Sequence, residues 1–381
     1  MNGILKEFYE VTADPYGTLM KWKERTGKRV IGVFPMWIPE EIIHAAGALP
    51  VVMWRSNEAV TWGYGHVPPY NCPMNKSVVD DVVKGKLKFM DGMVFLRQCL
   101  QSQEVAYITE KNAPPPFEEY LYLPPIYHGD KASKEFTGEE FEKLREGLEE
   151  FSGAKITDDK LKESIRIYNR NHSLLRELYD IRRERPGIIS ARDVLRIVWA
   201  SMLMPKEVHS QLLEGLISEL QEMVYEPTGG KKVFLSACLC IHPQFEILDM
   251  IEDLRMLIVD DDLYVGYRYF ANDAEVTDNP IVALVERYFI KTPIDPAKGE
   301  VELHWGDELI EKVRKIKADG IITLMTKYCP PHLCYYPDVK VKLTDAGIPE
   351  LLIEVEHEII SLEGIKTRLQ SFAEMIGGFE R

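Results

Sequence analysis

The 381-residue sequence lacks the short motifs that hold nucleotides or activate common nucleophiles. It has no GxxxxGK[ST] phosphate loop, no GxGxxG after a strand-like run and no GxSxG elbow. A phosphate loop needs glycines and a lysine at fixed spacing, because backbone amides must surround the phosphates. The GGKK at 229–232 precedes an apolar run and has the wrong spacing. Direct ATP or dinucleotide chemistry on this chain is therefore disfavoured.

Positive charge and long apolar runs are also scarce. The chain has 46 Lys and Arg against 61 Asp and Glu, a net charge of −15, so a basic face for nucleic acid is not expected. The longest clean apolar run, FLSACLCI at 234–241, is far shorter than the roughly 20 residues of a membrane span. No basic segment followed by an apolar one opens the sequence, so we expect no secretory signal and a cytoplasmic location.

Cysteine is scarce too, with six residues and no CxxC pair. The missing CxxC disfavours thioredoxin-type redox chemistry and ordinary zinc ribbons. A disulfide framework is not expected in a reducing compartment. Two interpretations remain for these residues: small apolar side chains of the core, or thiolates that hold a metal.

The patterns that are present divide the chain into three sections. Residues 1–135 alternate strand-like runs, such as KRVIGVFPM, with helical segments, and residues 228–381 repeat this alternation. Residues 136–227 between them have helical apolar spacing and almost no strand signal, as a scaffold or interface layer would. The sequence thus predicts an α/β protein with two doubly wound parallel-sheet domains, flavodoxin-like or Rossmann-like, joined by a helical section.

Three cysteines fall where such sheets carry their functional sites. Cys72 lies in a loop rich in turn-forming residues, and Cys99 and Cys329 each close a strand-like run. Ligands of open α/β sheets bind beyond the carboxyl ends of the strands. Soft thiolates from different loops suit an iron–sulfur cluster in a dry pocket. Local spacing does not establish that the three converge, so a cluster and three structural thiols both stay open.

The other cysteines have weaker positions. Cys238 and Cys240 alternate along a predicted strand, so they point to opposite faces and at most one can face the site. We expect both in the core. Cys334 is expected in a loop and ranks below Cys329 as a ligand. The two prolines after Cys329 cannot continue a strand and turn the chain there, which leaves His332 as an unassigned candidate near the metal.

Two polar segments are candidates for other roles. The segment 39–47 reads as a helix whose first turn could face the site, so Glu41 and His44 are candidate acid–base groups. An ordinary amphipathic helix is the alternative interpretation. Asp260 to Asp262 follow an apolar run and would suit a metal site or, as the favoured interpretation, a polar loop.

Taken in order, several segments resemble one family over nearly the whole chain. They are VIGVFPMWIPEEIIHAAGALPVVMW, GKLKFMDGMVFLRQC, ITDDKLKESIRIYNRN, VDDDLYVGYRYF, KYC…YYPD, GIPELLIEVEHE and TRLQSFAEMI. The sequence resembles the core subunits of 2-hydroxyacyl-CoA dehydratases and of ATP-dependent (class I) benzoyl-CoA reductases.

This resemblance implies a [4Fe–4S] cluster held by three cysteines, and the matching positions are Cys72, Cys99 and Cys329. The fourth iron position is then left to a non-cysteine ligand or to substrate. The resemblance also implies an acyl-CoA substrate and a second, homologous core subunit, usually in a heterodimer. A separate ATPase activator with its own [4Fe–4S] cluster would inject one electron at very low potential, in agreement with the missing phosphate loop.

The resemblance leaves three branches. VDDDLYVGYRYFA and WGDELIEKV are more similar to the benzoyl-CoA reductases, in which the electron enters the aromatic ring. In the dehydratases a ketyl radical lets water leave a 2-hydroxyacyl-CoA, and an acidic residue often follows the second ligand cysteine; here Leu100 follows Cys99. A double-cubane [8Fe–9S] protein, a homodimer, is kept open by Cys334 and by either Cys238 or Cys240. Of the three branches we favour the benzoyl-CoA reductase type. An alternative outside the enzymes is a non-catalytic scaffold subunit that pairs with an active partner.

Overall fold

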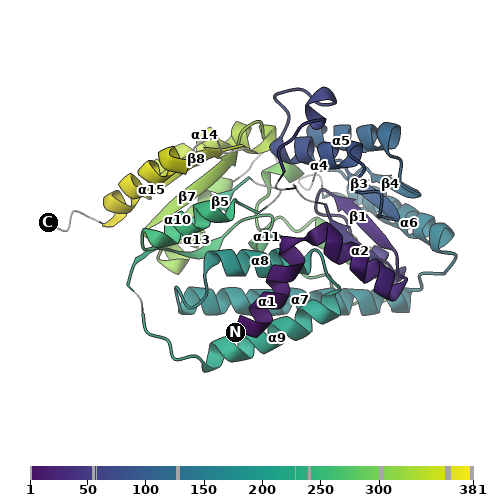
Figure 1. Ribbon diagram of the computed structural model, residues 1–381, viewed down its shortest axis with the longest axis horizontal. Coiled ribbons are helices and arrows are strands. Elements are labelled where there is room, and N and C mark those ends of the chain that lie inside the picture. The colour runs from purple at the N-terminus through teal and green to yellow at the C-terminus, as the bar shows by residue number, and fades with distance from the viewer. Residues whose placement is uncertain are drawn as a thin grey trace.

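The computed structural model describes residues 2–53, 56, 58–125, 129–227, 229–238, 242–299, 304–356 and 362–377. Within these ranges the chain forms two four-stranded sheets with helices around and between them (Figure 1). Cys240, which we expected in the core, lies outside the described residues.

Both sheets are entirely parallel and have the same strand order. The first has the order β2-β1-β3-β4 and the second β6-β5-β7-β8. The strands are β1 (Val30–Phe34), β2 (Leu49–Val52), β3 (Gly92–Leu96), β4 (Phe117–Leu121), β5 (Lys231–Ala237), β6 (Met256–Asp261), β7 (Gly320–Thr326) and β8 (Glu350–Val355). Every residue of β1, β2, β3 and β7 is buried, as expected for parallel strands covered on both faces. The predicted α/β class with two parallel sheets is confirmed.

Helices account for most of the remaining chain. They are α1 (Asn2–Ala13), α2 (Pro15–Thr26), α3 (Glu40–Ala45), α4 (Pro73–Val83), α5 (Leu100–Asn112), α6 (Lys131–Ser152), α7 (Asp158–Glu184), α8 (Ala191–Ser201), α9 (Lys206–Glu222), α10 (Phe245–Asp253), α11 (Tyr267–Phe270), α12 (Pro280–Tyr288), α13 (Trp305–Ile316), α14 (Pro330–Asp345) and α15 (Leu362–Gly377), with short 3-10 turns η1 (Gly63–Gly65) and η3 (Pro296–Lys298). No helix in the described part of the chain combines the length and apolar composition needed to cross a membrane.

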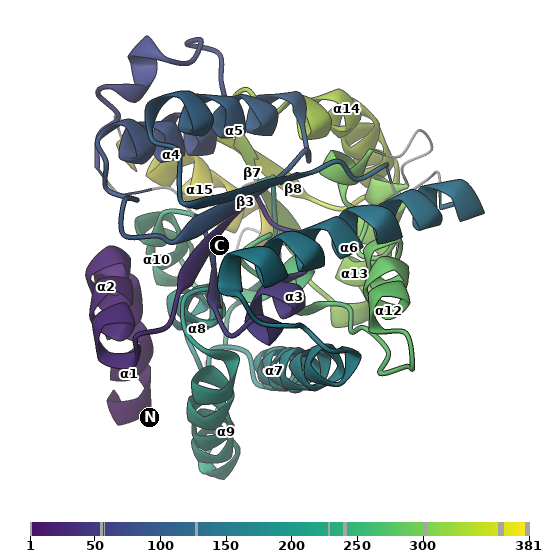
Figure 2. The ribbon, with the colours of Figure 1, turned by 90° about the vertical axis from the view of Figure 1, so that its right-hand side faces the viewer.

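Helices cover both faces of each sheet. Figure 2 shows α4 and α5 on one side of the first sheet and α3 and α6 on the other. In the second sheet, Phe234 and Ile321 pack with α13 and α14, whereas Val233 and Leu235 belong to the core shared with α10 and α15. Alternate residues of a strand point to opposite faces, so a continuous apolar run is what a doubly covered strand needs.

The helical section lies against both sheets. Its long helix α7 packs against α3 of the first half and β6 of the second, and α6 packs against α12 (Figure 1). Ser190 caps α8, because its hydroxyl accepts a hydrogen bond from the amide of Asp193 at 3.1 Å. One hydrophobic core runs through all three predicted sections, so their exact bounds, 1–135, 136–227 and 228–381, stay a prediction.

Two segments differ from the sequence-based expectation. The loop expected around Cys334 is wrong: Pro330 and Pro331 begin α14, and Cys334 is an exposed residue of that helix. Proline lacks only an amide that the first helical turn leaves unbonded, so a proline pair can start a helix as well as end a strand. The second difference is β4, which prolines flank and the sequence did not predict; it is an edge strand, where flanking prolines are tolerated.

Candidate metal centre

The three cysteines predicted as ligands occupy equivalent positions in the fold. Cys72 directly precedes α4, Cys99 precedes α5 and Cys329 precedes α14. Cys99 and Cys329 follow β3 and β7 at the carboxyl ends of the two sheets, and Cys72 ends the long connection after β2. Proline at the first helical position fixes where α4 and α14 begin, and so fixes the cysteine before each of them.

The thiols of these cysteines lie close enough to act on one another. Burial raises the pKa of Cys72 to about 12, and the neighbouring thiols of Cys329 and Cys99 add to the rise. Burial also raises the pKa of Cys99, with a contribution from Cys329, while hydrogen bonds from Ser102 oppose it. Contacts of neighbouring residues agree: the amide of Cys72 donates to the side chain of Gln101 at 3.0 Å, and the Nζ of Lys76 lies 5.3 Å from the ring centre of Tyr328. The segments that carry the three cysteines therefore lie near one another. Their role as metal ligands stays a prediction.

Each of the three sulfurs also faces the first turn of its helix. Backbone amides of Met74 and Asn75 lower the pKa of Cys72, those of Ser102 and Gln101 lower the pKa of Cys99, and that of His332 lowers the pKa of Cys329. Helix N-termini and amide donors stabilise a thiolate against its protonated form. Amide hydrogen bonds to sulfur also adjust the reduction potential of iron–sulfur clusters. The donor chemistry thus fits an iron–sulfur cluster.

A fourth cysteine, which sequence reasoning assigned to the core, lies beside Cys329. Cys238 directly follows β5 and is buried as predicted, but the ligand atoms of Cys238, Cys329 and His332 all lie within 4.8 Å of one another. The Nδ1 of His332 is 3.4 Å from the sulfur of Cys329. The signal available in the sequence was the place of Cys238 at the end of a strand, like Cys99 and Cys329.

The group around Cys329 is largely buried and electrically unusual. Contact with the thiol of Cys238, followed by burial, raises the pKa of Cys329 well above its ordinary value. Burial, and then the charge of Arg268, lower the pKa of His332 far below its ordinary value, so its ring is neutral. Among the described residues the Nε2 of His332 has no hydrogen-bond partner. Buried polar atoms are rarely left unpaired, and a ligand is one common reason.

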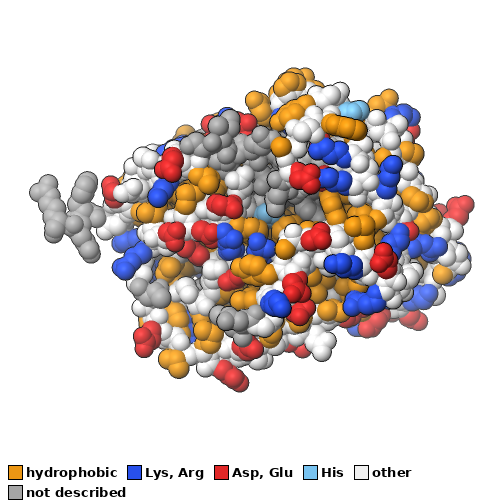
Figure 3. Space-filling view, in the orientation of Figure 1, with side chains coloured by type: hydrophobic (Ala, Val, Ile, Leu, Met, Phe, Trp, Pro, Cys, Tyr) orange, Lys and Arg blue, Asp and Glu red, His pale blue; other side chains and the backbone are white. Residues whose placement is uncertain are grey.

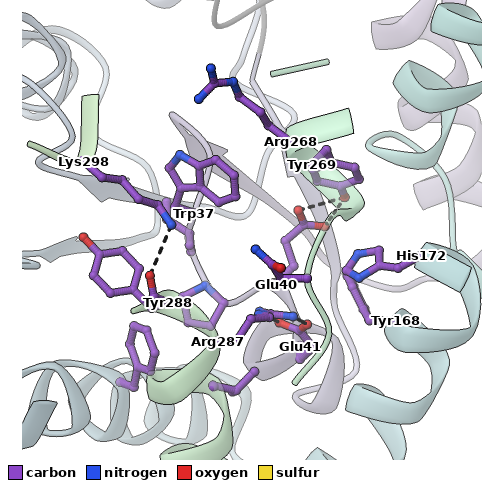
Figure 4. Close-up of a pocket in the computed structure, with 15 residues that line it drawn as sticks. Trp37, Glu40, Glu41, Tyr168, His172, Arg268, Tyr269, Arg287, Tyr288 and Lys298 are labelled. Atoms are coloured by element: carbon purple, nitrogen blue, oxygen red, sulfur yellow. Dashed lines mark hydrogen bonds and ion pairs between the residues drawn. The ribbon is translucent and has the colours of Figure 1, made fainter. Parts of the chain in front are cut away.

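Two adjoining cavities share a wall, and the larger of them borders Cys99. The larger, about 310 Å³, is lined by Cys99, Arg97, Leu123 and the prolines that follow β4. The smaller, about 60 Å³, shares a wall of Trp37, Tyr288 and Lys298 with the larger one (Figure 4). Burial lowers the pKa of Lys298 to about 8, and its Nζ lies 4.1 Å from the ring centre of Trp37.

Glu41 lines the smaller cavity, and its carboxylate is held by Arg287 in a two-pronged ion pair with one contact at 2.9 Å (Figure 4). Burial alone would raise the pKa of Glu41, but Arg287 outweighs it and the pKa lies below its ordinary value. Its neighbour Glu40, which sequence reasoning did not single out, also lines the cavity; burial raises its pKa despite Lys206 nearby.

His44, the other predicted acid–base residue, does not line either cavity. Its Nδ1 lies 2.9 Å from the hydroxyl of Ser164, and its Nε2 lies 3.3 Å from the carboxylate of Glu207. The structure therefore separates His44 from Glu41, although both belong to α3. The catalytic role proposed for each stays a prediction.

The aspartates at the end of β6 are ion-paired, so the polar loop expected for them is wrong. Asp260 and Asp261 belong to the strand and Asp262 follows it. All three are buried, and each meets an arginine: Arg183, Arg182 and Arg268, respectively. The arginines balance the charge of these consecutive carboxylates, and two of them, Arg182 and Arg183, come from the distant helix α7.

Fold and site together define a two-sheet α/β protein with half-buried or buried thiols beyond the carboxyl ends of strands in both sheets. The sequence model of the family described as 2-hydroxyglutaryl-CoA dehydratase, D-component, matches residues 35–376, and the chain belongs to this family. It is 30% identical to the beta chain of lactoyl-CoA dehydratase from Anaerotignum propionicum over 99% of both chains. It is 27% identical to the beta chain of (R)-phenyllactyl-CoA dehydratase from Clostridium sporogenes, over 97% of this chain and 98% of that one. It is 28% identical to one of the benzoyl-CoA reductase subunits of Thauera aromatica over 93% of both chains.

The chain is accordingly an enzyme subunit of the dehydratase or benzoyl-CoA reductase type. The resemblance inferred from the sequence is confirmed at the level of the family.

Proposed function

We propose that this chain is the cluster-binding core subunit of an ATP-dependent benzoyl-CoA reductase-type enzyme. The enzyme would reduce an aromatic acyl-CoA thioester by one electron at a time, with electrons from a separate ATPase activator that carries its own [4Fe–4S] cluster. One observation supports the proposal: half-buried cysteines from both halves of the chain, each before a helix, lie near enough to influence one another's pKa.

In this proposal Cys72, Cys99 and Cys329 hold a [4Fe–4S] cluster. Such a cluster supplies single electrons at a potential set by its surroundings. The chain contributes three half-buried thiols and backbone amides that favour their thiolate form; a partner subunit over this edge would exclude the remaining water. Excluding water protects a reactive radical from side reactions.

The larger cavity is the proposed place for the acyl group. Its volume of about 310 Å³ is at the lower end of the range for small-molecule sites. Leu123, Pro124 and Trp37 offer apolar walls beside Cys99, and Arg97 and Lys298 offer polar contacts. An acyl group there would lie next to the proposed metal ligands.

Glu41 and His44 keep their proposed acid–base roles, but only Glu41 lines a cavity. Glu41 lines the smaller cavity and is held ionised by Arg287, so it could act as a base only after its ion pair with Arg287 weakens. His44 faces Ser164 and Glu207 outside both cavities and would exchange protons only with those neighbours.

Exposed apolar residues next to the cysteines support a protein partner at this edge. Tyr70, Leu100 and Tyr328 are all exposed, and each lies within two residues of a predicted ligand. Apolar side chains also gather over the nearby segment that carries η1 (Figure 3). Exposed apolar patches of this kind mark interaction surfaces. The proposed partner is a homologous second core subunit in a heterodimer, or a second copy of this chain.

A 2-hydroxyacyl-CoA dehydratase subunit is the second candidate function. Two of the relatives, at 30% and 27% identity, bear dehydratase names, which favours this candidate. Leu100 after Cys99 favours the reductase instead. Both candidates use the same pocket and the same electron source, so they differ in what happens to the substrate.

The test is an anaerobic assay with partner, activator, ATP and reductant, in which benzoyl-CoA and a 2-hydroxyacyl-CoA are offered separately. Loss of water leaves the substrate's overall oxidation level unchanged, whereas ring reduction consumes electrons. The reductase proposal predicts turnover of benzoyl-CoA with reductant consumed in proportion to product. Turnover of the 2-hydroxyacyl-CoA alone, with reductant needed only in traces, would replace it with the dehydratase.

A further inference from the structure

We propose that the ammonium group of Lys298 contacts the thioester carbonyl of the acyl-CoA substrate and stabilises the negative charge that the carbonyl oxygen gains when the acyl group accepts an electron. This inference rests on the proposed function above and deepens it, because it assigns a catalytic contact to a residue outside the cysteine segments. It does not depend on the branch, since both candidate reactions add an electron to an acyl-CoA.

Lys298 occupies the wall between the two cavities. It ends the turn η3 and lines both cavities together with Trp37 and Tyr288 (Figure 4). The larger cavity, which is the proposed place of the acyl group, also borders Cys99. A substrate in that cavity would therefore meet the ammonium of Lys298 and a proposed metal ligand at the same time.

The Nζ of Lys298 is held mainly by aromatic rings. It lies 4.1 Å from the ring centre of Trp37 and 4.8 Å from that of Tyr288, and it donates to the carbonyl oxygen of Tyr288 at 3.3 Å (Figure 4). Within the described part of the chain, no carboxylate forms an ion pair with it. An ammonium has more N–H donors than this one bond uses, and aromatic faces attract a cation without accepting all of its protons. Donors are thus left for an oxygen of a ligand.

The other cations around the smaller cavity already have counter-charges. Arg268 and Arg287 each form an ion pair with a carboxylate. Asp295 accepts a hydrogen bond from the amide of Ala297 at 2.9 Å and lies 3.9 Å from Arg268. Burial lowers the pKa of Lys298 to about 8; the charge of Asp295 opposes this, and the two arginines add to it. A poorly solvated cation without a counter-charge gains most from a ligand that brings negative charge.

The charge that this ammonium lacks is the charge that the reaction creates. One electron added to a thioester places negative charge on the carbonyl oxygen, and in an aromatic thioester the ring shares its charge with that oxygen by conjugation. Lys298 would donate a hydrogen bond to the oxygen and keep its proton, so no bond to Lys298 forms or breaks. A donor of this kind interacts more strongly with the charged oxygen than with the neutral carbonyl, so it favours reduction more than binding.

Arg97 also lines the larger cavity, but it is a weaker candidate for this contact. Its side chain is exposed, so water screens its charge. Lys298 is partly covered by two rings and borders both cavities. The wall between the cavities therefore offers the better-placed cation.

The experiment compares the wild-type enzyme with Lys298→Met, Lys298→Gln and Lys298→Arg, each purified anaerobically with its partner subunit. Lys366→Met is the matched control, because Lys366 is an exposed lysine of α15. The probe is whichever of benzoyl-CoA and the 2-hydroxyacyl-CoA the wild type turns over, labelled with carbon-13 at its carbonyl. Infrared difference spectra are recorded without activator, so that the substrate binds but does not react. The kcat and KM are then measured with activator between about pH 7 and 9.

We expect the carbonyl band of the bound substrate at a lower frequency in the wild type and in Lys298→Arg than in Lys298→Met and Lys298→Gln, because an ammonium or guanidinium donor weakens the carbonyl bond. The kcat of Lys298→Met should fall about a hundredfold, while its KM changes less than about threefold and its iron content is unchanged. The wild-type kcat/KM should fall above about pH 8, where Lys298 loses its proton, and this fall should be absent in Lys298→Arg. Lys366→Met should match the wild type in every measurement.

One carbonyl frequency shared by the wild type, Lys298→Met and Lys298→Gln, with kcat values within about threefold of one another, would overturn the inference. An equal loss of kcat in all three Lys298 variants, with the wild-type pH profile retained, would also overturn it and leave Lys298 with a purely structural role. Lys298→Gln, which keeps a polar side chain, decides the question where Lys298→Met does not fold. An iron-loaded wild type that turns over neither acyl-CoA would overturn the proposed function itself, a result distinct from each of these.

Discussion

The strand ends of this fold carry two kinds of side chain, thiols and carboxylates, and the second sheet has both. The ends of β3, β5 and β7 carry Cys99, Cys238 and Cys329, whereas the end of β6 carries Asp260 to Asp262. The carboxylates meet arginines within hydrogen-bonding distance, while the thiols meet one another and the neutral ring of His332. The strand ends are equivalent positions in the fold, so the side chains decide whether a buried polar group already has a partner of opposite charge. We call the strand ends with Cys99, Cys238 and Cys329 the thiol edge, and the end of β6 with Asp260 to Asp262 the aspartate edge.

This difference separates two kinds of buried polar group. Each carboxylate of the aspartate edge is paired with an arginine, so this edge needs no added group to balance its charge. At the thiol edge, burial and the neighbouring thiols raise the pKa values of the sulfurs. A bound metal would lower these pKa values again, because it binds the thiolate form. Substitutions at the thiol edge should therefore change metal content, whereas substitutions at the aspartate edge should change the free energy of unfolding.

The largest effect is expected at the thiol edge. Cys329→Ala should remove the cluster and lower activity by at least about a hundredfold, because the thiolate that the second half contributes is lost. Iron and sulfide analysis together with the anaerobic assay would measure this, with Cys334→Ala as the control on the same helix. Full iron content in Cys329→Ala would show that Cys329 is not a ligand, and the proposed difference between the two edges would then lose its main support.

The aspartate edge should respond in stability and not in metal content. Arg182→Met leaves Asp261 as an unpaired buried carboxylate, which costs about 3–5 kcal/mol of unfolding free energy. Urea unfolding would measure the loss, and the double variant Arg182→Met, Asp261→Asn should recover much of it. If Arg182→Met lost iron while the unfolding free energy stayed constant, the aspartate edge would belong to the metal site.

In a third region, the helical section, a buried histidine should make the stability of the fold depend on pH, independently of both edges. His209 is fully buried; its Nδ1 accepts from the side-chain amide of Asn171 at 2.8 Å and its Nε2 donates to the carbonyl of Ile197 at 2.9 Å. Burial lowers the pKa of His209 to about 3. The unfolded chain takes up a proton below about pH 6.5 and the folded chain does not, so stability falls as pH falls from 6.5 towards 3.

From this residue alone the loss is about 2 kcal/mol at pH 5, at about 1.4 kcal/mol per pH unit. Urea unfolding at pH 7, 6 and 5 would measure it. His209→Gln, which keeps a polar side chain of similar reach, should have lower stability at pH 7 and a shallower decline with acid. Parallel pH curves for the two proteins would contradict a neutral, buried His209.

The smallest effect on folding is expected on the exposed rim of the thiol edge. Leu100 is 71% exposed, so Leu100→Ser should change the unfolding free energy by less than about 0.5 kcal/mol. It should weaken binding of the partner subunit by about 1 kcal/mol, because apolar contact is lost. Val224→Ser is the matched control, since Val224 is 89% exposed beyond α9. Equal sedimentation behaviour of the two variants would remove the rim from the partner interface.

The sequence was most informative where one local rule decides the structure. Cys99 and Cys329 were recognisable because apolar runs lead directly to them, and Cys72 because turn formers surround it. The contact between Cys238 and Cys329 was not predictable, because it depends on β5 and β7 being neighbours. The partners of Asp261 were hidden for the same reason, since Arg182 comes from a distant helix.

The sequence-based predictions were wrong or incomplete where the same residue type is compatible with two different local structures. The sequence predicts that Pro330 and Pro331 turn the chain into a loop, but they begin a helix and place Cys334 on its exposed surface. Nothing in the sequence separates Glu41 from Glu40, and the structure shows that both line the smaller cavity. Helical periodicity gives the face of a residue but not the partner it meets there.

The central claim is that thiols from both halves of the chain hold one cluster. Iron and acid-labile sulfide counted in the intact, anaerobically purified wild-type chain test it most directly. The account predicts about four of each per chain, with iron lost when either Cys99 of the first half or Cys329 of the second is replaced by alanine. An iron-free preparation that remains folded and was never exposed to air would contradict it.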